Sequence, residues 1–302
     1  MIRKATRQKA KLRIGLSAPS GSGKTYSAIL LAEGLATSSD KICLIDTENG
    51  RGDLYSHLNN YNIITLTAPF TPERYIACMK EAEEAGMEVI IIDSISHEWE
   101  GSGGLLESNE QLAKTKYKGN TWSAWSDTTP RHQKFIEKII SSPCHIITTV
   151  RNKVDTIMTE DKKVKKVGTK EITREGFEYE VTVNFNIDRD THTAVVSKDN
   201  TELFEGKNPF IISVETGKLL KDWADQGVDV IKPTQPKTSE TEKITPPATV
   251  KATVYQITMK AVEEAGKPEI LTTMQPKIEA STKLTEDEKA GLVLDKKKKL
   301  EK

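Results

Sequence analysis

Short apolar segments alternate with segments of helical periodicity along the first 230 residues of the sequence. Four short segments are expected to be strands, and one of them, Met87–Asp93, is the near-continuous apolar run expected of a central strand that is buried on both faces. These expected strands are Lys11–Ala18, Lys41–Asp46, Met87–Asp93 and Cys144–Val150. The expected helices are Thr25–Leu35, Pro72–Ala85, Thr121–Ser141 and Glu215 to about Gln226. Strands and helices that alternate in this way predict an α/β fold with a mostly parallel sheet.

Two later segments alternate apolar and polar residues instead. They are Glu178–Asp188 and His192–Lys198, and the alternation predicts an antiparallel pair at one edge of the sheet. After Val230, residues 232–251 hold four of the chain's 12 prolines and almost no large apolar side chain, which predicts a linker. We therefore expect a basic arm (1–13), an α/β core (14–230), a proline-rich linker (231–252) and a small helical C-terminal module (253–302).

The overall charge and the cysteine content exclude several classes of protein. The 302 residues carry 44 basic and 44 acidic side chains, so the chain is not a polycation, although the segment Arg3–Arg13 is basic and has no acid. No apolar run approaches the ~18–20 residues of a membrane span, so no membrane partner is expected. Three cysteines without paired spacing favour neither a disulfide framework nor a zinc site, and the cytoplasm is the expected location.

The strongest chemical signal is the segment APSGSGKT at Ala18–Thr25, between an expected strand and an expected helix. Such a loop wraps its backbone N–H groups around phosphates, and the helix N-terminus favours their charge. Lys24 can reach the β- and γ-phosphates, and the hydroxyl of Thr25 can bind Mg²⁺. The segment predicts ATP and Mg²⁺ as ligands, with nucleotide-binding residues Pro19, Ser20, Gly21, Ser22, Gly23, Lys24, Thr25 and Tyr26.

Carboxylates follow two of the expected strands. The run VIIID ends in Asp93 at the carboxyl end of its strand, where it can orient Mg²⁺ together with Thr25. In CLIDTEN, Asp46 ends a second strand and Glu48 lies two residues on. A carboxylate beside the γ-phosphate could polarise the attacking water as a general base. The alternative is that Asp46 or Glu48 only caps the junction of strand and loop.

Taken together, these segments resemble the RecA-like recombination ATPases. The resemblance implies a RecA-like P-loop NTPase core in which Lys24, Glu48 and Asp93 are catalytic, with Ile45-Asp46-Thr47-Glu48 matching the glutamate motif and Asp93-Ser94 the magnesium motif. In IITTVRNK, Thr149 takes the place of the family's glutamine sensor, and a DNA-binding loop follows it. In VVSKDN, Lys198 matches a basic residue that reaches the nucleotide of a neighbouring subunit.

In particular, the motifs resemble those of phage-encoded ATPases of the single-strand-annealing recombinase group. The similar motifs are APSGSGKT, IDTENG, IIDSISHEW with a following GGLL, SPCHII and VSKD, and the resemblance covers Lys9–Asp225. It implies hydrolysis of ATP, binding of single-stranded DNA and assistance to annealing, in the host cytoplasm if the protein is phage-encoded. It also implies a homo-oligomer, either a ring or a filament. A replication or single-strand-binding protein is an expected partner of the C-terminal module.

The segment Arg151–Arg174 carries eight basic and four acidic side chains and is predicted to be a mobile loop. Such a loop could neutralise DNA phosphates; the alternative is a plain solvated surface. The predicted DNA-binding residues are Arg151, Lys153, Lys162, Lys163, Lys165 and Lys166. Trp99 and Tyr117 are candidates for stacking on unpaired bases. The spacing of Trp122 and Trp125 on a helix favours core packing instead.

Two other classes of function remain open at this stage. A P-loop kinase or small-molecule phosphotransferase usually needs an arginine-rich lid, whereas the basic segment here is rich in lysine. A nucleotide-switched loader would bind a protein partner through its C-terminal helices, and its basic segments would then be incidental.

Overall fold

The computed structural model describes residues 6–158 and 164–228, with residues 154–158 and 164–169 described by their backbone alone. The predicted linker (231–252) and helical module (253–302) lie outside the described residues, as do Lys162 and Lys163. Within the described residues, no helix is long and apolar enough to cross a membrane.

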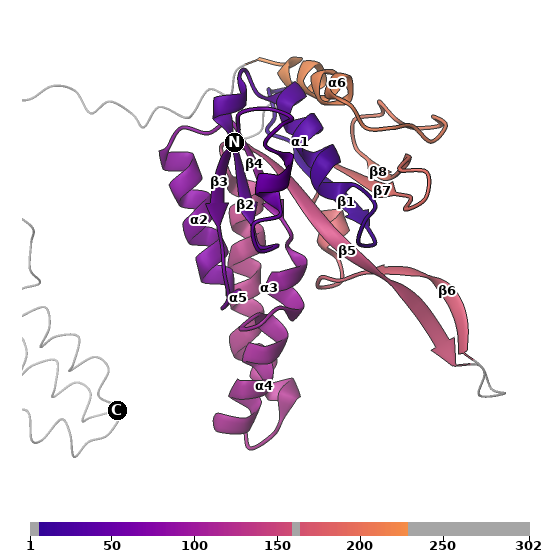
Figure 1. Ribbon diagram of the computed structural model, residues 1–302. Helices are drawn as coiled ribbons and strands as arrows, with labels where there is room; N and C mark the ends of the chain where they lie inside the picture. The colour runs from indigo at the N-terminus through magenta and orange to yellow at the C-terminus, as the bar shows by residue number, and fades with distance from the viewer. Residues whose placement is uncertain (1–5, 159–163, 229–302) are drawn as a thin grey trace, which may run out of the picture. The chain divides into compact units, whose positions relative to one another are not determined.

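Eight strands of the described chain form one sheet (Figure 1). Along the sheet their order is β3-β2-β4-β5-β1-β7-β8, with β6 paired to β5 outside this row. Each neighbouring pair in the row is parallel except β7 and β8, which are antiparallel. The strands are β1 Arg13–Ala18, β2 Ile42–Asp46, β3 Asn62–Thr65, β4 Val89–Asp93, β5 His145–Met158, β6 Val164–Glu171, β7 Val183–Ile187 and β8 Ala194–Asp199. The α/β fold with a mostly parallel sheet and an antiparallel edge is therefore confirmed.

Helices cover both faces of this sheet. They are α1 Lys24–Leu35, α2 Pro72–Glu84, α3 Ser96–Glu100, α4 Leu105–Thr115, α5 Thr121–Ser141 and α6 Val214–Asp225, and short 3₁₀ turns occupy Ser39–Lys41, Gly52–Tyr55 and Phe177–Tyr179. Local sequence explains where several begin: Pro72 suits a first helical turn, and the side chain of Asn120 accepts a hydrogen bond from the Ser123 N–H at 3.0 Å.

Alternate residues of the central strands belong to two separate cores. In β2, Leu44 packs with α1 and α6, whereas its neighbour Ile45 packs with α2 and α5. In β4, Ile91 and Ile92 divide in the same way. Side chains of a strand point to opposite faces in turn, so a strand covered on both sides must be apolar throughout. This requirement explains the unbroken apolar runs that mark these strands in the sequence.

The basic segment after Val150 is a β-hairpin and not the loop that the sequence predicts. The strand that starts at His145 continues to Met158, and its second half pairs antiparallel with β6. Lys165 and Lys166 pair with Ile157 and Thr156 in this hairpin, and Figure 1 shows the two strands leaving the sheet together. The prediction failed because the continuous apolar run ends at Val150 and the lysines that follow were given more weight than the alternation of β-branched and charged residues, which is a strand signal.

The sequence also failed to predict three short elements, β3, α3 and α4. Strand β3 has only four residues and lies at the sheet edge, and the glycines at 101, 103 and 104 separate α3 from α4. Beside strand β8, the apolar segment around Phe210 is not part of a named strand, and it pairs with Ala194 through an isolated β-bridge.

Part of the basic N-terminal segment is built into the core. Arg7 donates a hydrogen bond to the Trp223 carbonyl at 2.7 Å, and its guanidinium lies 4.5 Å from the Trp223 ring centroid. Arg13 is 6% exposed and donates to four carbonyl groups, those of Leu12, Ile140, Ser142 and Cys144. These two arginines therefore serve the fold.

Buried His145, at the start of β5, makes the stability of this core depend on pH. It is 6% exposed, and its Nδ1 accepts a hydrogen bond from the Leu12 N–H at 3.2 Å. Burial, followed by the charges of Lys11 and Arg13, lowers the pKa of His145 to about 3. The imidazole is therefore neutral in the fold and binds a proton readily once the chain unfolds.

We predict that the free energy of unfolding falls as the pH drops from about 6.5 toward 3, by up to about 1.4 kcal/mol per pH unit from this group. Urea unfolding between about pH 7 and about pH 5 measures the loss. His145→Gln should be less stable than the wild type at neutral pH but should lose less stability on acidification. His57→Gln, a change at an exposed histidine, is the control. Equal pH slopes for His145→Gln and the wild type would contradict the prediction.

Candidate active site

The loop between β1 and α1 has the backbone of a phosphate cradle. Gly21 and Gly23 have φ angles of +83° and +85°, a region that favours glycine, and Gly23 directly precedes α1. No side chain caps this helix, and its first turn contains no acidic residue. The first N–H groups of a helix have no acceptor within it, so these donors are available to an anion. Ser22 adds a buried hydroxyl without a hydrogen-bond partner in the described chain.

Lys24 is held at the mouth of this loop. Its Nζ donates to the carbonyl oxygens of Ala18 and Pro19, at 2.9 and 2.8 Å, and the residue is 9% exposed. Burial lowers the pKa of Lys24, whereas the nearby carboxylates of Asp93 and Glu48 oppose this change. The direct hydrogen-bond partners of the Lys24 ammonium group are neutral carbonyls. Phosphate oxygens are charged and would therefore form stronger hydrogen bonds with it.

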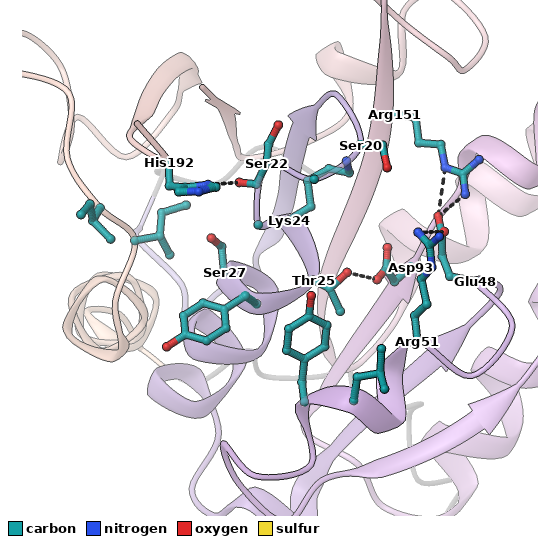
Figure 2. Close-up of a pocket in the computed structure, with 17 residues that line it drawn as sticks. Ser20, Ser22, Lys24, Thr25, Ser27, Glu48, Arg51, Asp93, Arg151 and His192 are labelled. Carbon is teal, nitrogen blue, oxygen red and sulfur yellow. Dashed lines mark hydrogen bonds and ion pairs between the residues drawn. The ribbon is translucent and has the colours of Figure 1, made fainter. Parts of the chain in front are cut away.

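Asp93 joins the loop to two strands of the sheet. The Thr25 hydroxyl donates to Asp93 Oδ2 at 2.5 Å, and the hydroxyl of Thr149 on β5 donates to Oδ1 (Figure 2 shows the Thr25 bond). Asp93 is 3% exposed. Burial raises the pKa of Asp93, and the hydrogen bonds from Thr149 and Thr25 oppose that rise. The carboxylate thus lies where a positive ion would offset its desolvation.

These oxygens fit Mg²⁺ bound together with a nucleotide. Among the residues that the structure describes, no group of three or more His, Cys, Asp or Glu side chains could hold a metal by itself. Mg²⁺ usually takes one or two protein oxygens and completes its shell with phosphates and water. The hydroxyl of Thr25 and the carboxylate of Asp93, which are in contact, match that requirement.

Glu48 lies at the same cavity and is held by two arginines (Figure 2). Arg151 donates to Glu48 Oε1 from Nε at 2.9 Å and from Nη2 at 2.5 Å, and Arg51 Nη1 lies 3.4 Å from Oε2. Asp46, the other candidate base, accepts hydrogen bonds from the backbone N–H groups of Glu48 and Gly52, at 2.6 and 3.2 Å. Asp46 therefore shapes the loop, and Glu48 remains the carboxylate that faces the cavity.

The cavity has a volume of about 510 Å³ and extends beyond the phosphate loop. Its far part is lined by residues that the sequence did not single out, namely Arg51, Leu54, Tyr55, His192, Ile211 and Ile212. Tyr26 and Tyr55 contact edge to face, with centroids 6.2 Å apart, and His192 Nδ1 lies 3.2 Å from the Ser22 carbonyl oxygen (Figure 2). An apolar wall beside a phosphate-binding loop suits a nucleoside. In the sequence, the segment RGDLY shortly after Glu48 could have indicated this wall, because Arg51, Leu54 and Tyr55 all line it.

Most of the predicted site residues come together here. The cavity is lined by Ser20, Gly21, Ser22, Gly23, Lys24, Thr25, Tyr26, Glu48, Asp93 and Arg151, and Thr149 contacts Asp93 from behind. Pro19 contributes only its carbonyl to Lys24. Lys153 lines a different cavity, and Lys198 lies on β8, where its Nζ donates to the Tyr179 carbonyl at 2.5 Å. Lys165 and Lys166 lie on β6 in the hairpin.

A phosphate-binding loop between a parallel strand and a helix, with an aspartate at the end of a nearby strand, defines a P-loop nucleoside triphosphatase. The chain belongs to the AAA domain family, because a family model described as an AAA domain matches residues 10–210. The chain thus contains an AAA-type P-loop ATPase domain, and the cavity at its phosphate loop is the candidate nucleotide site.

Other comparisons add little. No curated protein matches the sequence. One similar solved structure is described as a prototypical ATPase from the type III secretion system of pathogenic bacteria, with 17% identity and a TM-score of 0.32. The match covers 59% of this chain and 51% of that one, so the chain spans about half the length of that structure.

We predict that Lys24→Ala lowers ATP turnover by about 10²-fold or more, because the site loses its buried cation beside the phosphates. Phosphate release measures the rate, and thermal unfolding checks that the fold is kept. Lys218→Ala, a change at an exposed lysine on α6, is the matched control and should turn over ATP normally. Unchanged turnover in Lys24→Ala would contradict the placement of the phosphates at this loop.

Proposed function

We propose that the protein is a RecA-like ATPase that hydrolyses ATP with Mg²⁺, couples hydrolysis to binding of single-stranded DNA, and assists annealing in phage recombination. The observation that carries the proposal is the course of β5. Thr149 on this strand contacts Asp93, Arg151 contacts Glu48, and the strand then continues into the lysine-bearing hairpin. One continuous strand thus leads from the ATP site into the segment that contains the lysines.

The residues of the cavity divide the hydrolytic work among themselves. Thr25 and Asp93 would hold Mg²⁺, which supplies charge neutralisation on the β- and γ-phosphate oxygens. Lys24 and the loop N–H groups bind the same phosphates and stabilise the charge that develops on them. Glu48 accepts the proton of the attacking water as the general base. Lys24 and Asp93 are buried, and electrostatic interactions are stronger in a less polar environment than in water.

Arg151 gives a physical route for coupling. Two of its N–H groups donate to one oxygen of Glu48 and so occupy positions from which that oxygen could accept a hydrogen bond from water. The side chain of Arg151 is 34% exposed, so a DNA phosphate can compete for it. Transfer of Arg151 to a phosphate would leave Glu48 free to act on water.

The hairpin supplies the rest of the DNA contact in this proposal. Lys165 and Lys166 lie on β6, and Lys162 and Lys163 belong to the same basic stretch of sequence. Lysines of this kind neutralise DNA phosphates and release counterions, so we expect binding that weakens steeply with salt. Sequence motifs such as VSKD and IIDSISHEW are what support the recombination role.

A homo-oligomer, as a ring or a filament, is part of the same proposal. Lys198 lies on β8 at the edge of the sheet. In the proposed oligomer, a second copy packs at this edge, and Lys198 contacts the nucleotide bound to that copy. A replication or single-strand-binding protein is the proposed partner of residues 253–302, and the cytoplasm is the proposed location.

We predict that Glu48→Gln still binds ATP but hydrolyses it at least about tenfold more slowly, because the amide cannot take the proton of water. A fluorescent ATP analogue measures binding, and phosphate release measures turnover. Glu110→Gln, a change at an exposed position on α4, is the control. A normal rate in Glu48→Gln would place the general base elsewhere.

We predict that Arg151→Met removes most of the stimulation of ATP turnover by oligo(dT). Methionine makes no ion pair with Glu48, so a DNA phosphate has no ion pair to displace. The matched control is Arg51→Met: Arg51 contacts the same carboxylate at 3.4 Å but its side chain is 63% exposed. Turnover with and without oligo(dT) measures the ratio for each variant. Equal stimulation in Arg151→Met and the wild type would contradict the coupling route.

A further inference from the structure

A second cavity, of about 630 Å³, lies between the helices α3–α5 and the base of the β5–β6 hairpin. Three tryptophans line it: Trp99 at the end of α3, and Trp122 and Trp125 at the start of α5. We name it the tryptophan cleft. Its volume falls in the ~300–1,000 Å³ range of ligand sites. The ATPase reaction described above uses none of its aromatic side chains.

The tryptophans form a stacked and open surface. The rings of Trp99 and Trp125 stack with centroids 5.8 Å apart and an interplanar angle of 18°. Trp122 is 84% exposed, although its helical spacing predicted core packing. Leaving so large an apolar ring in water is unfavourable, at about 25 cal/mol for each Å² of apolar surface. A flat ligand that packs against Trp122 and the stacked pair would remove this apolar surface from water.

Two cations at the cleft have no carboxylate partner among the described residues. Lys153 is exposed, and Arg174 lies with its guanidinium 5.7 Å from the Trp125 ring centroid. Nη1 of Arg174 is buried without a hydrogen-bond partner in the described chain. Of the three acids in the lining, Glu175 pairs with Lys170, and Glu171 accepts hydrogen bonds from Ser17 and Asn184. The third, Glu100, is exposed to solvent. The cleft thus offers aromatic faces together with two spare cations.

We propose that the tryptophan cleft is a stacking site for unpaired nucleobases of single-stranded DNA. The bases lie against the tryptophan rings, and Lys153 and Arg174 contact the adjoining phosphates. Aromatic faces with nearby cations are what sequence-independent binding of single strands uses. This inference rests on the proposed function, since it names where the DNA bases bind.

The position of the cleft favours DNA over a protein segment as its occupant. Thr149, Arg151 and Lys153 are spaced by two along β5, and they contact in turn Asp93, Glu48 and the cleft. The backbones of Thr149 and Lys153 are therefore about 13 Å apart, at roughly 3.3 Å for each residue of β5. DNA bound in the cleft would lie beside the same strand that contacts the ATP site. An apolar peptide would leave Lys153 and Arg174 without an anion.

The cleft is also tied to the ATP site through α3. This helix begins three residues after Asp93, and the Ser96 hydroxyl accepts a hydrogen bond from the Arg151 N–H at 2.9 Å. Buried Glu98 pairs with His132 Nδ1 at 3.0 Å, and the His132 ring contacts Trp99 edge-on at 6.1 Å. A base stacked on Trp99 would thus contact a residue that is connected to Arg151 through His132, Glu98 and helix α3.

The test compares Trp122→Ala with Ile140→Ala in the full-length protein. Both side chains are exposed on α5, and Ile140 does not line the cleft, so it is the matched control. The probes are fluorescein-labelled oligo(dT) and an abasic oligonucleotide of the same length and charge. We expect Trp122→Ala to weaken oligo(dT) binding about five- to 150-fold and Ile140→Ala to leave it unchanged. Abasic DNA should bind the wild type and Trp122→Ala equally, and the DNA-free ATPase rate should stay the same.

Two results would overturn the assignment. If Trp122→Ala binds oligo(dT) as tightly as the wild type does, or if the wild type binds abasic DNA and oligo(dT) equally, no base stacks in the cleft. In either case salt-dependent binding of DNA by the wild type would leave the proposed function intact. Absence of any DNA binding by the wild type would instead contradict both proposals.

Discussion

The site depends on one buried carboxylate that joins three elements. Asp93 ends β4, accepts a hydrogen bond from Thr25 at the start of α1, and accepts another from Thr149 on β5. A carboxylate that is 3% exposed is costly to bury unless such partners and a cation compensate it. The family fold supplies the partners, and a nucleotide with Mg²⁺ would supply the cation. Through Asp93, strand β5 is therefore in hydrogen-bond contact with the ATP site.

Because of its length, strand β5 belongs both to the ATP site and to the β5–β6 hairpin. Its first half is parallel to β1 and β4 in the centre of the sheet, and its second half pairs only with β6. The two halves therefore have different surroundings: buried contacts with the ATP site at one end, and a basic hairpin with the tryptophan cleft at the other. Arg151 lies at the junction and holds Glu48. Neutral overall charge is compatible with this arrangement because the segment Arg151–Arg174 carries eight basic and four acidic side chains, an excess that acids elsewhere in the chain offset.

The sequence predicted the parts whose signals are local. The bounds of α5, Thr121–Ser141, coincide with the predicted ones, and the phosphate loop lies between its strand and helix as expected. Features that depend on distant contacts were missed. Arg151 and Glu48 are 103 residues apart, and the β5–β6 hairpin is stabilised by pairing that an apolar run does not reveal. Trp122 lies at helical spacing from Trp125, yet the structure leaves Trp122 exposed beside the cleft.

We propose that the binding of nucleotide and the binding of single-stranded DNA are linked through β5. Linkage is reciprocal, so a nucleotide that alters this strand must change the affinity for DNA by the same factor as DNA changes the affinity for nucleotide. The most direct measurement is the dissociation constant for oligo(dT) with and without a saturating non-hydrolysable ATP analogue and Mg²⁺, at one fixed salt concentration. We expect the analogue and Mg²⁺ to change the dissociation constant for oligo(dT) by about fivefold or more, and oligo(dT) to change the dissociation constant for the analogue by the same factor. Equal dissociation constants under the two conditions would contradict it.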